Sequence, residues 1–205
     1  LKDYAQRHPI VQCCEYVPEL EQPSVSIDNY AAAAETVRYL IAQGHRRVAL
    51  LSAGNDFIST QLRRQGYEDV LRQAGLYCGD ELVAYADADY SYNSGLTAAD
   101  ALLRLQPRPT AICCVSDILA LSVISRAHDL GLRVPEDLSV TGIDDVDYTT
   151  MFHPQLTTVA QPCYEMGQES LRILLRMLRG GQPPRTRTFL PYKLVLRESV
   201  AAHNE

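Results

Sequence analysis

The 205-residue chain carries 19 Lys and Arg residues against 25 Asp and Glu residues, which gives a formal net charge of −6. This acidic balance argues against direct contact with nucleic acid, because a nucleic-acid-binding surface needs a basic face. Hydrophobic residues make up 46% of the chain and charged residues 21%, as in globular domains. No apolar run approaches the roughly 20 residues that a membrane helix needs, so we expect no membrane partner.

The six cysteines favour free thiols over disulfides or a metal site. No CxxC motif occurs, and four of the cysteines form two adjacent pairs inside apolar runs. Neighbouring residues of a strand point to opposite faces, so such pairs are poorly placed to bond to each other. We expect buried, reduced thiols and a reducing compartment such as the cytoplasm. The cysteines are Cys13, Cys14, Cys78, Cys113, Cys114 and Cys163.

Short apolar runs alternate with segments of helical periodicity from residue 24 to residue 160. The runs typical of strands are 25–27, 47–52, 82–85, 111–115, 138–143 and 156–160. The segments typical of helices are 28–43, 61–74, 92–105 and 117–130. This alternation predicts βαβ units, which form a mostly parallel sheet with helices on both faces.

The pattern changes after the strand at 156–160. Residues 165–178 have an amphipathic helical pattern, which Gly180-Gly181 and Pro183-Pro184 end. The following segment, 186–197, alternates as an edge strand or antiparallel strand does.

Ligands of an open parallel sheet bind at the carboxyl ends of its strands. Here these ends are Cys14-Glu15, 53–60, 87–92, Ser116-Asp117 and Asp144-Asp145. They contain neither a GxGxxG nor a GxxxxGK[ST] loop, so we expect no mononucleotide phosphate site. The chain also lacks GxSxG and HExxH motifs, and we expect neither an enzyme nor a metal or cofactor site.

His45 follows Gly44 at the end of the helical segment 28–43. A positive charge at a helix C-terminus is favourable, because it complements the helix dipole. We therefore expect His45 to act as such a charge.

The stretch SVTGIDDVD, residues 139–147, ends a strand with three acidic residues. Asp144 directly follows the strand, where a carboxylate can accept hydrogen bonds from vicinal hydroxyl groups. Asp145 is expected to cap a following helical turn, and Asp147 to be solvated. A Mg²⁺ site is the weakest interpretation, because such sites usually work with a phosphate.

Several ordered motifs carry a resemblance to a known family. They are SIDNYAAA, GHRRVALLSA, RRQGYEDVLRQAGL and the long stretch VSDILALSVISRAHDLGLRVPEDLSVTGIDDVDYTTMFHPQLTTVAQP. Together they resemble the effector domain of the LacI/GalR transcription regulators over essentially the whole chain. The resemblance implies a periplasmic-binding-protein-like α/β fold with a ligand cleft between two subdomains. It divides the chain into a C-terminal subdomain, 29–158 plus 193–205, and parts of an N-terminal subdomain, 1–28 and 159–192.

The resemblance also implies residues that contact a ligand. Arg63 matches an arginine that grips hydroxyl or carboxylate groups, and Tyr90 matches an aromatic residue that stacks on a sugar or base. Cys14 stands where many members have Asp or Asn, and a thiol is a poor hydrogen-bond partner. The expected ligand-binding residues are Cys14, Phe57, Ser59, Arg63, Tyr90, Ser116, Asp144 and Gln161.

A dimer surface is implied as well, on the helix 117–130 and in the apolar loop that follows the acidic stretch. Its expected residues are Leu121, Ile124, Ser125, Met151 and Phe152.

The function that the resemblance implies is effector sensing and dimerisation in a DNA-binding repressor. The effector would be a small nucleoside or sugar, and operator DNA would be bound through an N-terminal headpiece that precedes this chain. Two alternatives remain at this point: a sugar-binding protein of a transport system, and a Mg²⁺-dependent enzyme that uses the acids of the DDVD sequence.

Overall fold

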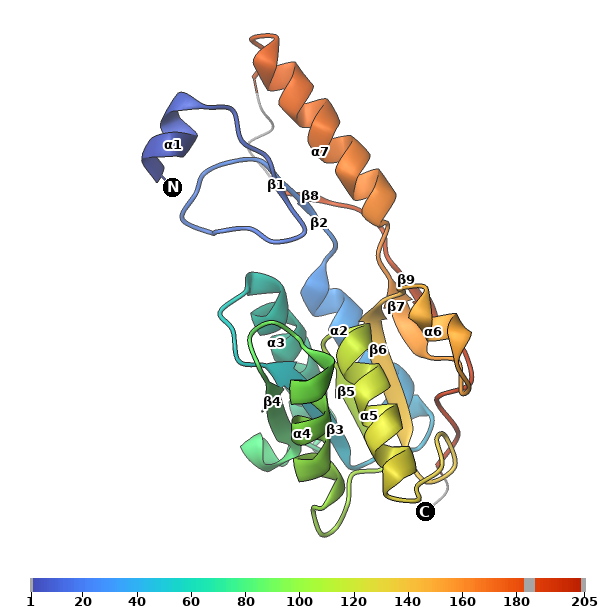
Figure 1. The fold of residues 1–205 in the computed structure, drawn as a ribbon. Helices are drawn as coiled ribbons and strands as arrows, with labels where there is room; N and C mark the ends of the chain where they lie inside the picture. The colour runs from blue at the N-terminus through green and yellow to red at the C-terminus, as the bar shows by residue number, and fades with distance from the viewer. Residues whose placement is uncertain (1, 183–186, 204–205) are drawn as a thin grey trace.

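The computed structural model describes residues 2–182 and 187–203, which contain a six-stranded and a three-stranded sheet (Figure 1). In the larger sheet only the last edge strand is antiparallel to its neighbour. The strand order of this sheet is β4 (Val83–Ala86), β3 (Val48–Ala53), β5 (Ala111–Cys114), β6 (Ser139–Asp144), β7 (Thr157–Ala160) and β9 (Lys193–Val195).

Helices cover both faces of the larger sheet. On one face α2 (Asn29–Ala42) packs against α3 (Ile58–Gln73), and on the other α4 (Tyr92–Leu103) packs against α5 (Asp117–Asp129). The strands between these layers are almost fully buried, as expected of a parallel sheet with two covered faces. The expected α/β fold class is therefore confirmed, and the carboxyl ends of the parallel strands lie at one edge of the layer.

The strands and helices predicted between residues 24 and 178 are all present, with ends displaced by no more than about three residues, the usual uncertainty of such boundaries. Two short elements were not predicted, α1 (Lys2–Arg7) and β1 (Gln12–Cys13), whereas α6 (Tyr148–Met151) is the helical turn expected after the acidic stretch. A 3₁₀ turn at Gly79–Leu82 precedes β4.

The smaller sheet joins β1, β2 (Ser24–Ser26) and β8 (Thr188–Phe189) in parallel, with α7 (Cys163–Leu178) packed against it. Three segments connect this region to the larger sheet: 27–28, 161–162 and 190–192. The Pro183-Pro184 break and the start of the predicted segment 186–197 lie outside the described residues. Neither α3 nor α7, at 16 residues the longest described helices, nor any other helix described, has the length and apolarity to span a membrane.

The role expected of His45 is wrong. Its side chain is 2% exposed, and its ring nitrogens lie 2.9 Å from the hydroxyl groups of Thr110 and Ser139. Burial, and secondarily the stacked ring of His203, lower the pKa of His45 to about 4. His45 is thus a neutral hydrogen-bonding residue between helix α2, the sheet and the C-terminal segment.

The cysteines are free, but most of them are not buried as expected. Cys113 and Cys114 lie inside strand β5, whereas the other four are exposed. The apolar run around Cys13 and Cys14 belongs to a two-residue strand of the small sheet, which covers too little surface to bury both side chains.

Candidate functional site

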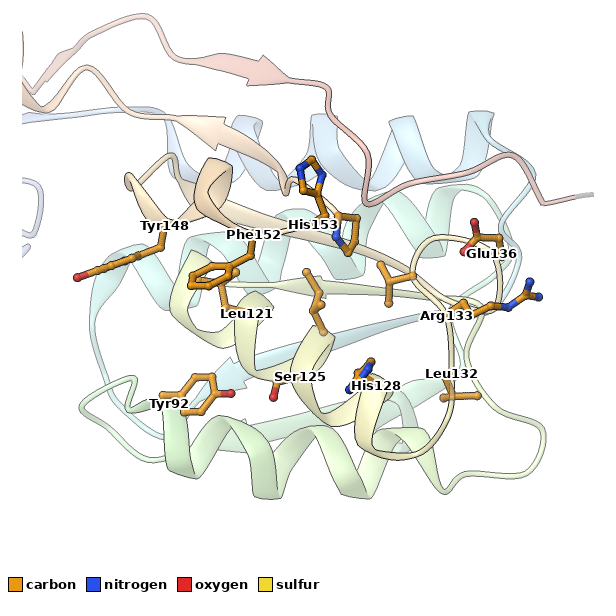
Figure 2. Close-up of a pocket in the computed structure, with 13 residues that line it drawn as sticks. Tyr92, Leu121, Ser125, His128, Leu132, Arg133, Glu136, Tyr148, Phe152 and His153 are labelled. Atoms are coloured by element: carbon orange, nitrogen blue, oxygen red, sulfur yellow. The ribbon is translucent and has the colours of Figure 1, made fainter.

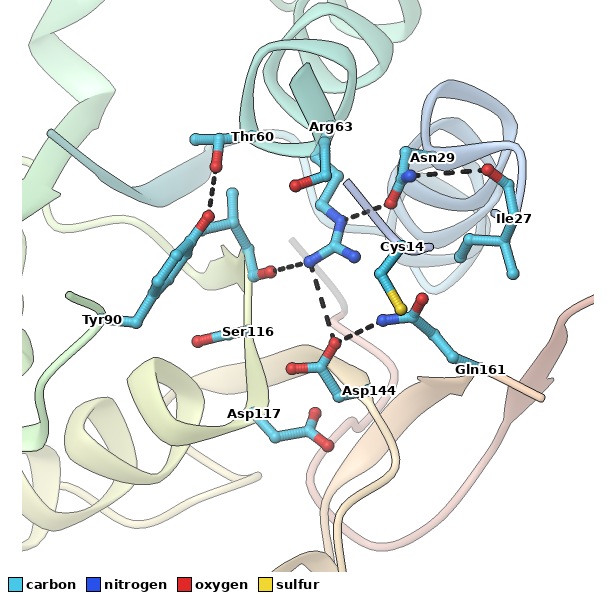
Figure 3. Close-up of polar contacts among 12 residues, drawn as sticks. Cys14, Ile27, Asn29, Thr60, Arg63, Tyr90, Ser116, Asp117, Asp144 and Gln161 are labelled. Carbon is cyan, nitrogen blue, oxygen red and sulfur yellow. Dashed lines mark hydrogen bonds and ion pairs between the residues drawn. The ribbon is translucent and has the colours of Figure 1, made fainter. Parts of the chain in front are cut away.

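Arg63 lies at the centre of a polar network at the carboxyl edge of the larger sheet (Figure 3). Its side chain projects from α3 and is only 6% exposed. Nε donates to Asn29 Oδ1 at 2.8 Å, and Nη1 donates to the carbonyl oxygen of Val115 at 2.5 Å. Nη1 also lies 3.9 Å from Asp144 Oδ1. The buried guanidinium is therefore fixed in direction by two acceptors from other elements.

Asp144 faces Arg63 from the end of strand β6. Gln161, from the segment after β7, donates to Asp144 Oδ1 at 2.6 Å. Burial raises the pKa of Asp144, while Arg63 and the Gln161 amide oppose that rise. Three residues expected to bind a ligand thus lie together in one network, although they are 17 to 98 positions apart.

The three acids of the DDVD sequence have different surroundings, and one expectation about them is wrong. Asp145 does not cap a helix: its carboxylate binds Arg197 Nη2 at 2.6 Å. Asp147 occupies the N-cap position of α6, but its side chain makes no capping hydrogen bond there and is exposed, as expected. Within the described residues, no group of three or more His, Cys, Asp or Glu side chains is arranged to hold a metal ion.

Phe57 and Tyr90 form an aromatic pair beside this network. Their ring centroids are 6.4 Å apart at an interplanar angle of 24°, and Phe57 is 48% exposed. The Tyr90 hydroxyl is hydrogen-bonded to Thr60 Oγ1, which fixes the ring (Figure 3). This pair offers an apolar, partly exposed surface of the kind that stacks on sugar or base rings.

Ser59 is already engaged within the protein. Its backbone N–H donates to Glu15 Oε2 at 3.3 Å, and its hydroxyl donates to Glu15 Oε1. Burial raises the pKa of Glu15, and the backbone N–H of Ser59, followed by the charge of Arg63, opposes the rise. Glu15 thereby supplies the acceptor that the N-terminus of α3 lacks, because Phe57 at the N-cap has no capping side chain.

Ser116 and Cys14 lie on two sides of the network. Ser116 is the N-cap of α5, and its hydroxyl accepts from the Leu119 N–H at 3.4 Å. Partial burial, followed by the neighbouring Cys13 thiol, raises the pKa of Cys14 to about 12. Cys14 therefore presents a protonated thiol, a poor hydrogen-bond partner.

Asn29 and Glu15 belong to this site but were not among the expected ligand-binding residues. Glu15 lies at one of the strand ends that the topology rule marked, although it was not chosen as a ligand-binding residue. Asn29 is the first residue of α2, and no local sequence pattern predicts its role in the site, because its partner Arg63 is 34 positions away.

The largest cavity, about 750 Å³, lies elsewhere, on the outer side of α5 (Figure 2). Leu121, Ile124, Ser125 and Phe152, all expected at a dimer surface, line it, whereas Met151 is exposed outside its wall. A second hollow of about 430 Å³ lies between residues 12–19 and the start of α3, and Phe57 and Glu15 are part of its wall.

Comparisons with known proteins agree with this architecture. The family described as periplasmic binding protein-like domain matches residues 37–200, well over half of the chain. The chain belongs to this family. Within it, the HTH-type transcriptional repressor CytR of Escherichia coli (strain K12) is 39% identical over 194 residues, which are 95% of this chain and 56% of CytR. The resemblance to LacI/GalR regulators is thereby confirmed, and the segment 18–33 also resembles CytR.

Solved structures support the same relationship. A LacI transcriptional regulator from Bacillus cereus subsp. cytotoxis NVH 391-98 has a TM-score of 0.91 at 30% identity, over 98% of this chain and 71% of that one. A complex of the regulator CelR with cellobiose has a TM-score of 0.85 at 34% identity, over 92% of this chain and 58% of that one. This chain spans about half the length of the curated relatives it matches. These relatives are transcriptional regulators, so neither the transport protein nor the Mg²⁺-dependent enzyme is favoured.

Proposed function

We propose that this chain is the effector-sensing and dimerisation region of a DNA-binding transcriptional repressor, and not an enzyme. The observation that carries the proposal is the meeting of Arg63, Asp144 and Gln161 at the carboxyl edge of the parallel sheet. Ligands of such sheets bind at this edge. The effector is a small nucleoside or sugar, and CelR, a relative of similar fold, has been solved with cellobiose.

The chemistry of the network suits a polyhydroxylated ligand with a flat ring. Asp144 can accept hydrogen bonds from two vicinal hydroxyl groups, and the guanidinium of Arg63 can donate to their oxygen atoms. Phe57 and Tyr90 supply the surface on which a base or the apolar face of a sugar stacks. Ser116, Ser59, Gln161 and Cys14 complete the proposed set of contacts.

Effector binding acts through the segments that join the two sheets. Gln161 lies in one of these segments, and its amide holds Asp144. A ligand hydroxyl that takes the place of this amide on Asp144 favours a different placement of the smaller sheet relative to the larger one. Because this coupling is reciprocal, a partner that senses the placement of the sheets changes the affinity for the effector equally.

The other proposed partners follow from the same assignment. A second copy of the chain docks on the apolar cavity beside α5, and we assign Leu121, Ile124, Ser125, Met151 and Phe152 to this interface. Operator DNA is bound through a separate headpiece, because this region carries a net charge of −6. A cytoplasmic location is part of the same proposal, and it is supported by relatives that regulate transcription.

Isothermal titration of the full-length protein with cytidine, ribose and cellobiose tests the proposal, with Asp144→Asn as the variant and Asp147→Asn as its control. Asp144→Asn keeps the side-chain shape but removes the charge that accepts both hydroxyl groups, so we expect affinity for the bound probe to fall at least about tenfold. The control removes an exposed acid three positions away and should change affinity less than about twofold. Equal affinities of both variants, or no binding of any probe by the unmodified protein, would refute the proposed function.

A further inference from the structure

Asp117 is a fully buried carboxylate directly behind Asp144 (Figure 3). It is the first residue of α5, where the N-terminal end of the helix favours a negative charge. Among the described residues, no basic side chain forms an ion pair with it. Instead it accepts from the Val146 backbone N–H at 3.0 Å and from the Thr158 hydroxyl at 2.5 Å. Its partners thus come from the loop after β6 and from strand β7.

The loop held by Asp117 has an unusual backbone. Asp144 has a φ of 138° and Asp145 a φ of 60°, two consecutive residues with side chains in a region that favours glycine. Such a conformation persists only where the surroundings impose it. Two contacts do so here: Asp117 holds the Val146 N–H on one side, and Arg197 holds the Asp145 carboxylate on the other.

Gly142 shows that the sequence makes room for this carboxylate. A Cβ atom on Gly142 would lie 2.2 Å from Asp117 Oδ1, and its backbone needs no positive φ. The glycine is therefore required by the approach of Asp117, as glycine within a strand often is when another group comes close. Gly142 pairs with Thr158 across the sheet, so the glycine and both donors surround one side chain.

We propose that Asp117 is a positioning residue of the effector site: its carboxylate fixes the turn 144–146 so that the side chain of Asp144 points at Arg63 and the ligand. The inference rests on the proposed function, because it assigns ligand contact to Asp144. Asp117 also contacts Asp144 directly. A hydrogen bond from the Asp117 backbone N–H lowers the pKa of Asp144, against the rise that burial causes. Asp117 itself does not touch the ligand.

The test uses Asp117→Asn in the full-length protein and two readouts. The first is hydrogen exchange of the Val146 amide, which does not depend on any ligand. An asparagine cannot accept with both terminal atoms, so we expect the protection of this amide to fall at least about tenfold. The second readout is affinity for cytidine and ribose by calorimetry, where we expect a loss of about tenfold or more.

Ser122→Ala is the matched control, because Ser122 is equally buried on the same helix and bonds only to Leu119 within it. It should leave both readouts within about twofold of the unmodified protein. Thr158→Val removes one of the two donors to Asp117 and serves as a milder variant if Asp117→Asn does not fold. We expect it to lower both readouts by a smaller factor.

A double variant distinguishes positioning from general support of the fold. If Asp117 acts through Asp144, Asp117→Asn costs no further affinity once Asp144 is replaced by alanine. Additive losses of affinity would overturn the inference. It would also be overturned if Asp117→Asn left the exchange protection of the Val146 amide unchanged, or lowered that protection without changing the affinity. If the unmodified protein binds neither probe, the proposed function fails, while exchange of the Val146 amide still decides whether Asp117 fixes the turn.

Discussion

His45 and Asp117 are buried ionisable residues that affect folding in opposite directions. Burial, followed by His203, lowers the pKa of His45 from 6.5 to about 4. Burial raises the pKa of Asp117 from 3.8 to about 6, against the opposing hydrogen bonds from Thr158 and Val146. Both shifts exist because a charge is less stable inside the protein than in water.

The sign of each effect follows from which state binds the proton more tightly. Between pH 4 and 6.5 His45 is protonated more readily in the unfolded chain than in the folded one. The contribution of neutral His45 to the free energy of unfolding is therefore fully present above pH 6.5 and is lost as pH falls toward 4. Between pH 3.8 and 6 Asp117 is protonated more readily in the folded chain than in the unfolded one. The contribution of Asp117 to the free energy of unfolding is therefore fully present below pH 3.8 and is lost as pH rises toward 6. Each effect is on the order of 3 kcal/mol, and they largely offset each other between pH 4 and 6.

Single substitutions should expose each effect. Relative to the unmodified protein, we expect the unfolding free energy of His45→Asn to fall as pH rises from 4 to 6, because the contribution of His45 no longer offsets that of Asp117. That of Asp117→Asn should rise over the same interval, for the reverse reason. Urea denaturation at pH 4, 5, 6 and 7 measures both slopes. Parallel pH profiles for the three proteins would contradict this prediction.

Some residues of the site could be found from sequence and others could not. The prediction that Asp144 contacts a ligand used its position after a strand and the resemblance to LacI/GalR regulators. The prediction that Asp145 caps a helix used only its distance from an apolar segment. The second failed because Arg197, 52 residues away, binds the same carboxylate. A local rule cannot foresee a partner that the fold brings from another element.

Helices α2 and α3 approach closely at Gly66. A Cβ atom there would lie 2.4 Å from the Tyr30 carbonyl oxygen and 3.1 Å from the Ala34 nitrogen. These are backbone atoms of a helix, so they cannot move aside as a flexible side chain would. The contact determines how closely α3 lies on α2, and with it where Arg63, three residues earlier, meets Asn29.

Replacing Gly66 with alanine should therefore destabilise the protein by about 1–3 kcal/mol, because the two helices must separate. This is opposite to the intrinsic effect, since alanine favours a helix over glycine by about 1 kcal/mol. Gly167→Ala is the control, because a Cβ atom on this glycine of α7 meets no atom within 4 Å. Chemical denaturation should show Gly167→Ala at least as stable as the original, and a stable Gly66→Ala would refute the close contact.

The helices and strands between residues 24 and 178 were predictable, and the two short elements before them were not. Helices such as α5 show their periodicity over several turns, and strand β6 is an apolar run that ends at polar residues. The elements α1 and β1 have six and two residues, too few to display a period. Their conformation depends on what they pack against.

At the scale of the whole molecule, an apolar cavity of about 750 Å³ lies beside α5. Phe152 is 63% exposed at its edge, and Leu121 and Ile124 line it from α5. Exposed apolar surface rimmed by polar side chains marks interaction sites in soluble proteins. The cavity lies away from Arg63 and Asp144, so it can hold a second copy while the ligand site stays accessible.

Phe152→Glu should shift the protein from dimer toward monomer, because the dimer would then bury an unpaired charge. We expect at least about a tenfold weaker dimer by sedimentation equilibrium, with an unchanged circular dichroism spectrum. Leu196→Glu is the control, since Leu196 is 56% exposed and lies outside this cavity. Equal dimer affinity in both variants would remove Phe152 from the interface.

The sequence by itself determined the alternation of strands and helices, the parallel sheet and the edge where we propose that a ligand binds, because these depend on local periodicity and on a general rule of sheet topology. The tertiary structure alone decided which polar groups meet there. It paired Arg63 with Asn29, Ser59 with Glu15 and Asp145 with Arg197, and it buried His45 as a neutral residue. These pairings depend on distances between separate elements, and the free energy of a buried polar group depends on the partner that the fold supplies.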